Sequence, residues 1–290
     1  MILVTGATGY VGGAILRRLS SLEVETVAMV RDAKAAGLRL PPGTPLRVGD
    51  YEDSSALRRA FAGADQIILV SSDGDARAVM RHHANAIAAA AEACPSRIIF
   101  MSIIDIDPDS PFYYAPVYRD AERRLVASGV PSTILRCGLY SDFILDHWLK
   151  PAIESREVLL PAGQGRVAPI SREDVASAIV AIASQPSTRG ETYAVTGHQA
   201  LTLDEVVAAF GDVAGRPMRY SACPRSDYLA WAWAHLEDPW PHAFSTLCES
   251  IGEGRFGRVS NDFSELVGHE PESLSQYLRR SFSAAAPSKG

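Results

Sequence analysis

The chain opens with the stretch Met1-Ile2-Leu3-Val4-Thr5-Gly6-Ala7-Thr8-Gly9-Tyr10-Val11-Gly12-Gly13, in which a short apolar run leads into closely spaced glycines. Beyond it, Ile15, Leu16 and Leu19 recur at helical spacing, so the stretch predicts a strand, a glycine turn and a helix. The glycine spacing suits a turn whose bare backbone lies against a pyrophosphate at the helix N-terminus. At the start of an alternating chain, this order favours a dinucleotide site over a purely structural turn.

Apolar segments that alternate with helical patterns follow this opening. They predict further strands at Val24–Val30, Leu46–Val48, Gln66–Val70, Arg97–Met101 and Ser132–Leu135. Such alternation is typical of an α/β fold, here a Rossmann-type doubly wound parallel sheet followed by a smaller, mostly helical C-terminal domain. We expect an NADP-binding domain over residues 1–140, completed by parts of 156–200, and a smaller substrate-binding region over 141–290.

The cofactor site is expected where the strands end, because open parallel sheets bind ligands beyond the carboxyl ends of their strands. Arg31 follows the second strand, where NAD-specific folds usually carry an acidic residue, so it suits the 2′-phosphate of NADP(H). Asp32 would point the opposite way, and NAD(H) and a merely solvated Arg31 stay as alternatives. The residues expected to bind the cofactor are Gly6, Thr8, Gly9, Tyr10, Val11, Gly12, Arg31, Asp50, Tyr51, Ser71, Ser72 and Cys137.

Composition and charge limit the class of protein. The 290 residues include 28 basic and 34 acidic side chains, for a net charge of −6, without the clustered cations that nucleic-acid binding needs. The four cysteines form no C-x-x-C pair and follow no leader-like segment, which predicts reduced thiols in a cytoplasmic protein. No apolar stretch has the ~18 residues of a membrane helix. His82 and His83 lack partners at metal-ligand spacing, so neither a membrane nor a metal is expected.

Several of these stretches together resemble atypical short-chain dehydrogenases of the NmrA-like group, and among them its NADPH-dependent quinone reductases. The resemblance rests on residues 6–12, 30–32, 49–51, 135–141 and 171–176, and it extends to residues 262–269. It implies a Rossmann domain, a small C-terminal domain and an active site in the cleft between them. The group also contains redox-sensing regulators that bind a dinucleotide without turnover, so a regulator is the non-enzyme alternative.

The usual proton donor of short-chain dehydrogenases is missing. It needs Tyr-x-x-x-Lys, whose lysine lowers the tyrosine pKa, but no lysine here has a tyrosine four residues before it. Tyr118 is followed by Glu122, which would raise its pKa, and Arg123 stands where relatives have a lysine. A quinone needs little acid catalysis, because its reduced oxygen is a stabilised phenolate. The candidate catalytic residues are Tyr140, Tyr118, Ser102 and Arg123, with packing or surface ion pairing as their alternative roles.

Aromatic residues gather in the second half of the chain. Phe143 and Trp148 follow the sixth strand, and Trp240 and Phe244 lie near a proline-flanked break, which predicts a substrate site with flat walls. Two further tryptophans, Trp231 and Trp233, alternate with alanines and are expected instead to pack in a small helical core. Cys137 is expected to be a small apolar filler beside the nicotinamide rather than a nucleophile.

These features predict an NAD(P)H-dependent oxidoreductase of the quinone reductase type that acts on a planar aromatic small molecule. Because a hydroquinone can react directly with oxygen, the reaction would serve as the reducing step of a flavin- and metal-free monooxygenase-type hydroxylation in aromatic polyketide, hence antibiotic, biosynthesis. A dinucleotide-sensing regulator and a ketone or enoyl reductase with Tyr140 as acid are the alternatives. The exact substrate, the proton donor and a homodimeric state are left open by the sequence.

Overall fold

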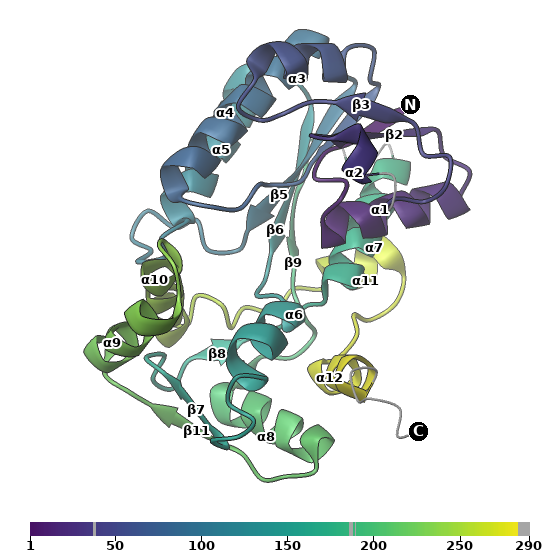
Figure 1. The fold of residues 1–290 in the computed structure, drawn as a ribbon. Coiled ribbons are helices and arrows are strands. Elements are labelled where there is room, and N and C mark those ends of the chain that lie inside the picture. The colour runs from purple at the N-terminus through teal and green to yellow at the C-terminus, as the bar shows by residue number, and fades with distance from the viewer. Residues whose placement is uncertain (37–38, 186–187, 189, 284–290) are drawn as a thin grey trace. The chain divides into compact units, whose positions relative to one another are not determined.

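A computed structural model gives the fold of residues 1–36, 39–185, 188 and 190–283 (Figure 1). These residues divide into two compact units, each made of separate stretches of the chain. Unit 1 comprises Met1–Pro108, Tyr114–Arg136 and Val175–Tyr193. Unit 2 comprises Asp109–Tyr113, Cys137–Asp174 and the described part of Ala194–Gly290.

The central sheet has seven strands in the order β3-β2-β1-β4-β5-β6-β9. Its strands are β1 (Ile2–Val4), β2 (Thr26–Val30), β3 (Leu46–Val48), β4 (Gln66–Leu69), β5 (Arg97–Ile103), β6 (Ser132–Cys137) and β9 (Thr192–Val195). Strand β1 pairs in parallel with both β2 and β4, so that Ile2 lies opposite Thr26 on one side and Gln66 on the other. The expected Rossmann-type fold is confirmed, and the strand order reverses between β1 and β4, where such sheets bind their ligands.

Helices cover both faces of this sheet, and in Figure 1 α3, α4 and α5 lie on one face with α1 and most of α7 on the other. These helices and α2 span α1 (Tyr10–Ser21), α2 (Ala33–Ala36), α3 (Ser54–Phe61), α4 (Ala76–Ala93), α5 (Ala115–Ser128) and α7 (Arg172–Ser184). The carboxylates of Asp53 and Asp75 accept backbone N–H groups at the starts of α3 and α4. Buried residues such as Leu3, Ile67 and Phe100 pack against α3, α4 and α5 and fix these helices on the sheet.

The strand ends differ from the sequence expectation. Strand β5 continues to Ile103 and β6 to Cys137, two residues beyond their expected ends, while β2 begins only at Thr26. The hydroxyl of Ser102 has a hydrogen-bond partner in α5, which allows a polar residue to continue the buried strand β5. Ser102 and Cys137 are therefore buried strand residues, and their expected place in exit loops is wrong.

Unit 2 combines two small sheets with helices. Strand β7 (Glu157–Leu160) pairs in parallel with β11 (Arg219–Ala222), and β8 (Arg166–Val167) pairs antiparallel with β10 (Leu201–Thr202). Its first helical segment, α6 (Ser141–Ile144), runs directly into a π-helical turn, η1 (Leu145–Leu149). The remaining helices are α8 (Leu203–Ala214), α9 (Arg225–His235), α10 (Trp240–Gly252), α11 (Asp262–Val267) and α12 (Leu274–Ser283).

Candidate active site

The glycine turn presents bare backbone at the start of α1. Gly6 has a φ of +58°, and the N–H of Gly9 donates to the Gly6 carbonyl at 2.9 Å. A Cβ on Gly12 would lie 2.3 Å from the Gly6 carbonyl oxygen, so a larger residue cannot be placed there without moving the turn. Gly9 caps α1 without a side chain, which leaves the first N–H groups of the helix without an intrahelical acceptor. Such a cradle fits the pyrophosphate of a dinucleotide.

Thr5 and Tyr51 join the strands that carry this turn. The Tyr51 hydroxyl lies 2.6 Å from Thr5 Oγ1 and 2.7 Å from the Val70 carbonyl oxygen. Thr5 Oγ1 in turn accepts the N–H of Val70 at 2.9 Å. Burial raises the pKa of Tyr51, so the phenol stays protonated. The hydroxyl of Tyr51, one of the residues expected to bind the cofactor, is thus directed into unit 1, where it ties the ends of β1 and β4 together.

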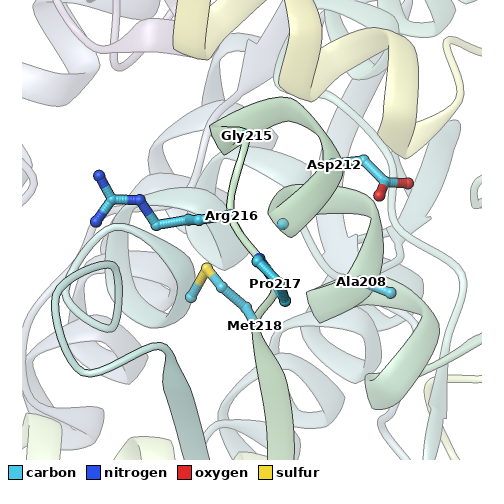
Figure 2. A pocket seen from close by; sticks show the side chains of 7 residues that line it. Ala208, Asp212, Gly215, Arg216, Pro217 and Met218 are labelled. Atoms are coloured by element: carbon cyan, nitrogen blue, oxygen red, sulfur yellow. The ribbon is translucent and has the colours of Figure 1, made fainter.

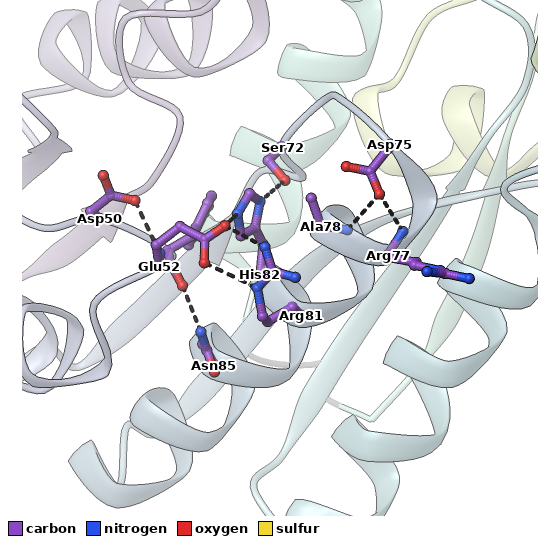
Figure 3. A network of polar contacts seen from close by, with 10 residues as sticks. Asp50, Glu52, Ser72, Asp75, Arg77, Ala78, Arg81, His82 and Asn85 are labelled. Atoms are coloured by element: carbon purple, nitrogen blue, oxygen red, sulfur yellow. Dashed lines mark hydrogen bonds and ion pairs between the residues drawn. The ribbon is translucent and has the colours of Figure 1, made fainter. Parts of the chain in front are cut away.

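A polar network joins the loop after β3 to helix α4, as Figure 3 shows. Glu52 accepts hydrogen bonds of 3.0 and 2.7 Å from Arg81, and His82 Nε2 lies 2.8 Å from the same carboxylate. His82 Nδ1 lies 2.8 Å from Ser72 Oγ, and the His82 ring stacks on Tyr51 with centroids 5.8 Å apart. The hydrogen bonds from Arg81 and then His82 lower the pKa of Glu52 to about 2. Ser72 is therefore engaged with His82 at this exit.

Arg31 and Asp32 take different roles after β2. Arg31 is exposed, and its guanidinium makes no hydrogen bond or ion pair with any residue that the structure describes. The Asp32 carboxylate accepts the N–H of Lys34 at 2.8 Å and of Ala35 at 3.3 Å, which starts α2. Asp50, the other acidic candidate nearby, accepts the N–H of Glu52 at 3.0 Å in the same manner. Arg31 thus has a guanidinium able to pair with a 2′-phosphate of NADP(H), while the Asp32 carboxylate already accepts backbone N–H groups.

Ser71 faces the interior of unit 1 together with His83. Ser71 Oγ donates to the carbonyl oxygen of Met101 at 3.0 Å and lies 3.1 Å from His83 Nε2. Burial and then the neighbouring His82 lower the pKa of His83 to about 4, with Asp120 opposing. The other ring nitrogen, Nδ1, has no hydrogen-bond partner among the described residues. His83 is thus a neutral, buried imidazole at neutral pH.

A buried carboxylate joins three elements where the usual catalytic lysine would stand. Glu122 on α5 accepts Ser102 Oγ at 2.6 Å and two hydrogen bonds from Arg136, at 3.0 and 2.6 Å. Glu122 is only 7% exposed, so this pairing is what compensates its charge. From the sequence, Glu122 was expected only to affect Tyr118, and its pairing with Arg136 was not predicted. The charged Arg136 within the strand β6 was the feature of the sequence that could have indicated a buried acidic partner.

The other two candidates on α5 lie apart from this group. The Tyr118 ring packs 5.2 Å from His83 and 6.3 Å from Phe100, centroid to centroid, at the edge of the core of unit 1. Arg123 has a side chain that is 72% exposed and lies 3.6 Å from Asp120. The placement of Arg123 matches the surface ion pair that was its alternative role.

Tyr140 follows β6 in unit 2, and the guanidinium of Arg172 lies over its ring. The guanidinium carbon of Arg172 lies 4.8 Å from the centroid of Tyr140. Cys137, three residues earlier, is 2% exposed, and burial raises its pKa to about 12, opposed by a hydrogen bond with Tyr140. A thiol that stays protonated suits the expected filler role and not that of a nucleophile.

The four aromatic residues expected to bind the substrate form one cluster in unit 2, although about a hundred residues separate its halves. Phe143 lies 5.4 Å from Trp148 and 5.0 Å from Phe244, both edge-on, and Trp240 lies 5.5 Å from Phe244. His147, which the sequence analysis did not select, lies 4.7 Å from Phe143 and 5.3 Å from Phe244. We call these five residues the aromatic cluster. The turn η1 carries two of its members, and π-helical turns often occur at functional sites.

The expectation for the two remaining tryptophans of α9 is wrong. Trp231 and Trp233 are 46% and 55% exposed, so they do not form a small helical core. Trp231 stacks on His235, one turn later, with centroids 4.9 Å apart. The alanine between them, Ala232, is buried instead, because successive helix positions point in different directions.

A separate cavity of about 440 Å³ lies at the end of α8 and before β11 (Figure 2). No residue selected from the sequence lines it, and in Figure 2 Asp212 and Arg216 lie on opposite sides of it. Its lining residues are Ala208, Gly211, Asp212, Gly215, Arg216, Pro217 and Met218.

The described residues contain neither a metal-binding cluster nor a membrane-spanning helix. No group of three or more His, Cys, Asp or Glu side chains there is arranged to hold a metal ion. None of the described helices is long and apolar enough to cross a bilayer.

Residues 6–186 match the NAD(P)H-binding family, and the chain belongs to this family. It is 29% identical over 286 residues to quinone oxidoreductase 2 of Escherichia coli (strain K12), covering 97% of this chain and 99% of that relative. It is 32% identical over 222 residues to the NAD(P)H azoreductase of Xenophilus azovorans, covering 77% of each chain.

A solved structure shows the same fold with its cofactor. The NADPH-dependent quinone oxidoreductase from Escherichia coli, complexed with NADPH, matches with a TM-score of 0.89 and 28% identity, over 97% of this chain and all of that one (100%). The resemblance drawn from the sequence is thus confirmed. Because these relatives are NAD(P)H-dependent oxidoreductases, the expected class of enzyme is confirmed as well.

Proposed function

We propose that this enzyme transfers a hydride from NADPH to a planar quinone. The observation that carries the proposal is the aromatic cluster of unit 2. In it, Phe143, Trp148, Trp240 and Phe244 contact one another through edge-on and tilted ring pairs. Flat aromatic surfaces bind planar ligands by stacking and burial. The names of the relatives, a quinone oxidoreductase and an azoreductase, support an acceptor of this conjugated kind.

The proposed cofactor residues lie in unit 1. When bound, NADPH supplies the hydride. The turn of Gly6, Gly9 and Gly12 accepts the pyrophosphate, with Thr8, Tyr10 and Val11 around it, and Arg31 pairs with the 2′-phosphate. Asp50 and Tyr51 shape the adenine side, with Ser71 and Ser72 below the ribose. Cys137, in unit 2, fills space without reacting.

The proposed acceptor chemistry needs no strong acid. Glu122 occupies the place four residues after Tyr118 and pairs with Arg136, so a carboxylate stands where the usual catalytic lysine would be. A quinone that takes up a hydride becomes a phenolate, which can wait for a proton from solvent. We assign Tyr140 the role of donating a hydrogen bond to this developing charge. Ser102, whose hydroxyl serves Glu122, and the exposed Arg123 are left out of this assignment.

The decisive experiment follows nicotinamide absorbance while purified protein and NADPH are mixed with naphthoquinones and anthraquinones. We expect oxidation of NADPH that saturates with quinone, and a Tyr140→Phe variant that loses about tenfold in kcat, because one hydrogen bond to a developing but stabilised anion is removed. Binding of NADPH without oxidation by any quinone would favour the regulator instead. Activity on ketones or enones, with a much larger loss in the same variant, would favour the ketone or enoyl reductase.

The preference for NADPH is part of the proposal and has its own test. Arg31→Ser should raise the KM for NADPH at least about tenfold while changing that for NADH little, since only the phosphate loses its partner. Equal effects on the two nucleotides would contradict the assignment of Arg31.

We further propose that the hydroquinone product reacts with oxygen, as in a flavin- and metal-free hydroxylation of an aromatic polyketide. The two electrons delivered by the hydride then reduce one oxygen atom to water while the other enters the ring, which returns to the quinone. The measurement is oxygen uptake and product mass during aerobic incubation with NADPH and an anthraquinone. Unchanged oxygen and unchanged substrate would remove this extension and leave the reductase itself untouched.

A further inference from the structure

Arg172 is a largely covered cation whose charge is only partly matched. Its side chain is 28% exposed, less than that of Arg136, Arg219 or Arg280, each of which makes a two-pronged pair with a glutamate. Among the described residues, the guanidinium of Arg172 forms an ion pair only with Asp142, at 3.9 Å, which is too far for a hydrogen bond. No other described residue hydrogen-bonds this guanidinium, so its N–H donors have room for a ligand.

The surroundings hold Arg172 in one orientation. Its guanidinium carbon lies 4.8 Å from the centre of the Tyr140 ring. Its backbone N–H donates at 3.1 Å to Asp142 Oδ2, so the buried carboxylate positions the start of α7. A guanidinium fixed over an aromatic face presents its edge as a planar fork, which matches a carboxylate.

Arg172 also lies near the aromatic cluster, because Asp142, which its guanidinium approaches to 3.9 Å, is the residue directly before Phe143. Its charge is close enough to His147 to help lower the pKa of that ring, after burial, while Asp146 opposes. Asp146 itself is paired with Lys150 at 2.6 Å. In unit 2, Arg172 therefore lies close to Tyr140 and Asp142, in the segment that leads into Phe143, and no anion among the described residues is hydrogen-bonded to its guanidinium.

Resting on the proposed quinone reductase function, we propose that Arg172 selects acceptors that carry a carboxylate on their aromatic framework. The flat part of the acceptor lies on the aromatic cluster, and the carboxylate pairs with the free edge of the guanidinium. The enzyme is then specific for planar quinone acids rather than for quinones in general.

The test compares anthraquinone-2-carboxylate with its neutral carboxamide, which has the same shape. Dissociation constants are measured by calorimetry in the presence of NADP⁺, and kcat/KM with NADPH. We expect the wild-type protein to bind the carboxylate about tenfold more tightly, and Arg172→Met to bring this ratio close to one. Arg172→Lys should keep part of the preference, as it retains the charge without the planar fork.

Lys150→Met is the matched control, since it removes a cation of the same unit that already has a partner, and it should keep the tenfold ratio. A wild-type ratio near one, or a ratio that survives in Arg172→Met, would overturn the role of Arg172, even if both quinones are reduced. If the carboxylate binds with the expected ratio but no quinone is ever reduced, the proposed function fails and the anion selectivity stands. Melting temperatures of the variants show whether each one is folded.

Discussion

Gly12 and Gly13 are neighbours in α1 that differ in what surrounds them. A Cβ on Gly12 would meet backbone atoms of Gly6 and Ala7 at 3.0 Å or less, whereas one on Gly13 would have no contact closer than 3.4 Å. The first position thus requires glycine for the turn to approach the helix, and the second tolerates a methyl group. Gly13 lies in a helix interior, where glycine costs about 0.5–1 kcal/mol relative to alanine.

The different surroundings of Gly12 and Gly13 lead to a prediction for cofactor binding. We expect Gly12→Ala to weaken NADPH binding at least about tenfold, because the turn must move away from α1, and Gly13→Ala to change the affinity less than about twofold. Fluorescence titration with NADPH measures both, and thermal unfolding shows whether each variant is folded. Equal affinities of the two variants would mean that the turn does not hold the pyrophosphate.

Single residues also show the limit of the sequence analysis. The turn at Gly6, Gly9 and Gly12 could be predicted from the sequence, because the reason for glycine at each position is a property of the local backbone. The roles of Ser102 and Arg123 could not, since they depend on where distant side chains lie: Glu122 receives the hydroxyl of Ser102, and Arg123 points into solvent. Arg172 was passed over because its value lies in its contact with Tyr140, which no spacing reveals.

Among the elements, β5, α5 and β6 are held together by the buried Glu122. Removing Arg136 would leave this carboxylate without its charged partner, and breaking a buried pair costs roughly 3–5 kcal/mol. Because the Arg136 side chain is 36% exposed, we expect a smaller loss, about 2 kcal/mol, for Arg136→Met. Urea unfolding measures the change.

The double variant Arg136→Met with Glu122→Gln is the matched comparison. It removes the charge together with its partner, so most of the lost stability should return. If the single and double variants are equally unstable, the pairing contributes little, and packing around the arginine stem explains the loss.

The elements themselves were largely predictable from periodicity and caps, as the Rossmann order of the sheet shows. The ends of the strands were less predictable: β5 and β6 run two residues further than their apolar patterns, because Ser102 and Arg136 find a partner in Glu122 of helix α5. The aromatic cluster joins η1 to α10, and the aromatic composition suggested its members while only the fold could bring them together.

For the whole molecule, we expect the free energy of unfolding to fall at acidic pH because of His83. Its pKa is lowered from 6.5 to about 4 in the folded state, so between these values the unfolded chain binds a proton that the folded protein does not. The stability is therefore fully present above pH 6.5 and declines as the pH falls toward about 4. The shift corresponds to about 3 kcal/mol in total, of which about 2 kcal/mol is lost by pH 5.

The measurement is urea unfolding between pH 7.5 and 5 for the wild-type protein and for His83→Gln. The variant should lack most of this slope, while the control His82→Gln, at the neighbouring position, should keep most of it, because burial contributes more than His82 to the lowered pKa of His83. A wild-type slope that persists in His83→Gln would assign the dependence to other groups.

Fragments test how unit 1 is assembled. The guanidinium of the fully buried Arg97 binds Gln66, but it also binds the Ala183 and Gln185 carbonyl oxygens and Thr188 Oγ1. A fragment of residues 1–140 lacks the last three partners and strand β9, so we expect it to show no cooperative unfolding by circular dichroism. The full chain is the reference, and a cooperative transition in the fragment would show that the first 140 residues suffice.

The chain passes between units 1 and 2 after Pro108, Tyr113, Arg136, Asp174 and Tyr193. A gene chimaera that joins two homologues by a single crossover would therefore mix parental segments inside both unit 1 and unit 2. Libraries that recombine such reductases need junctions at all of these borders, and blind shuffling would mostly yield mismatched interiors.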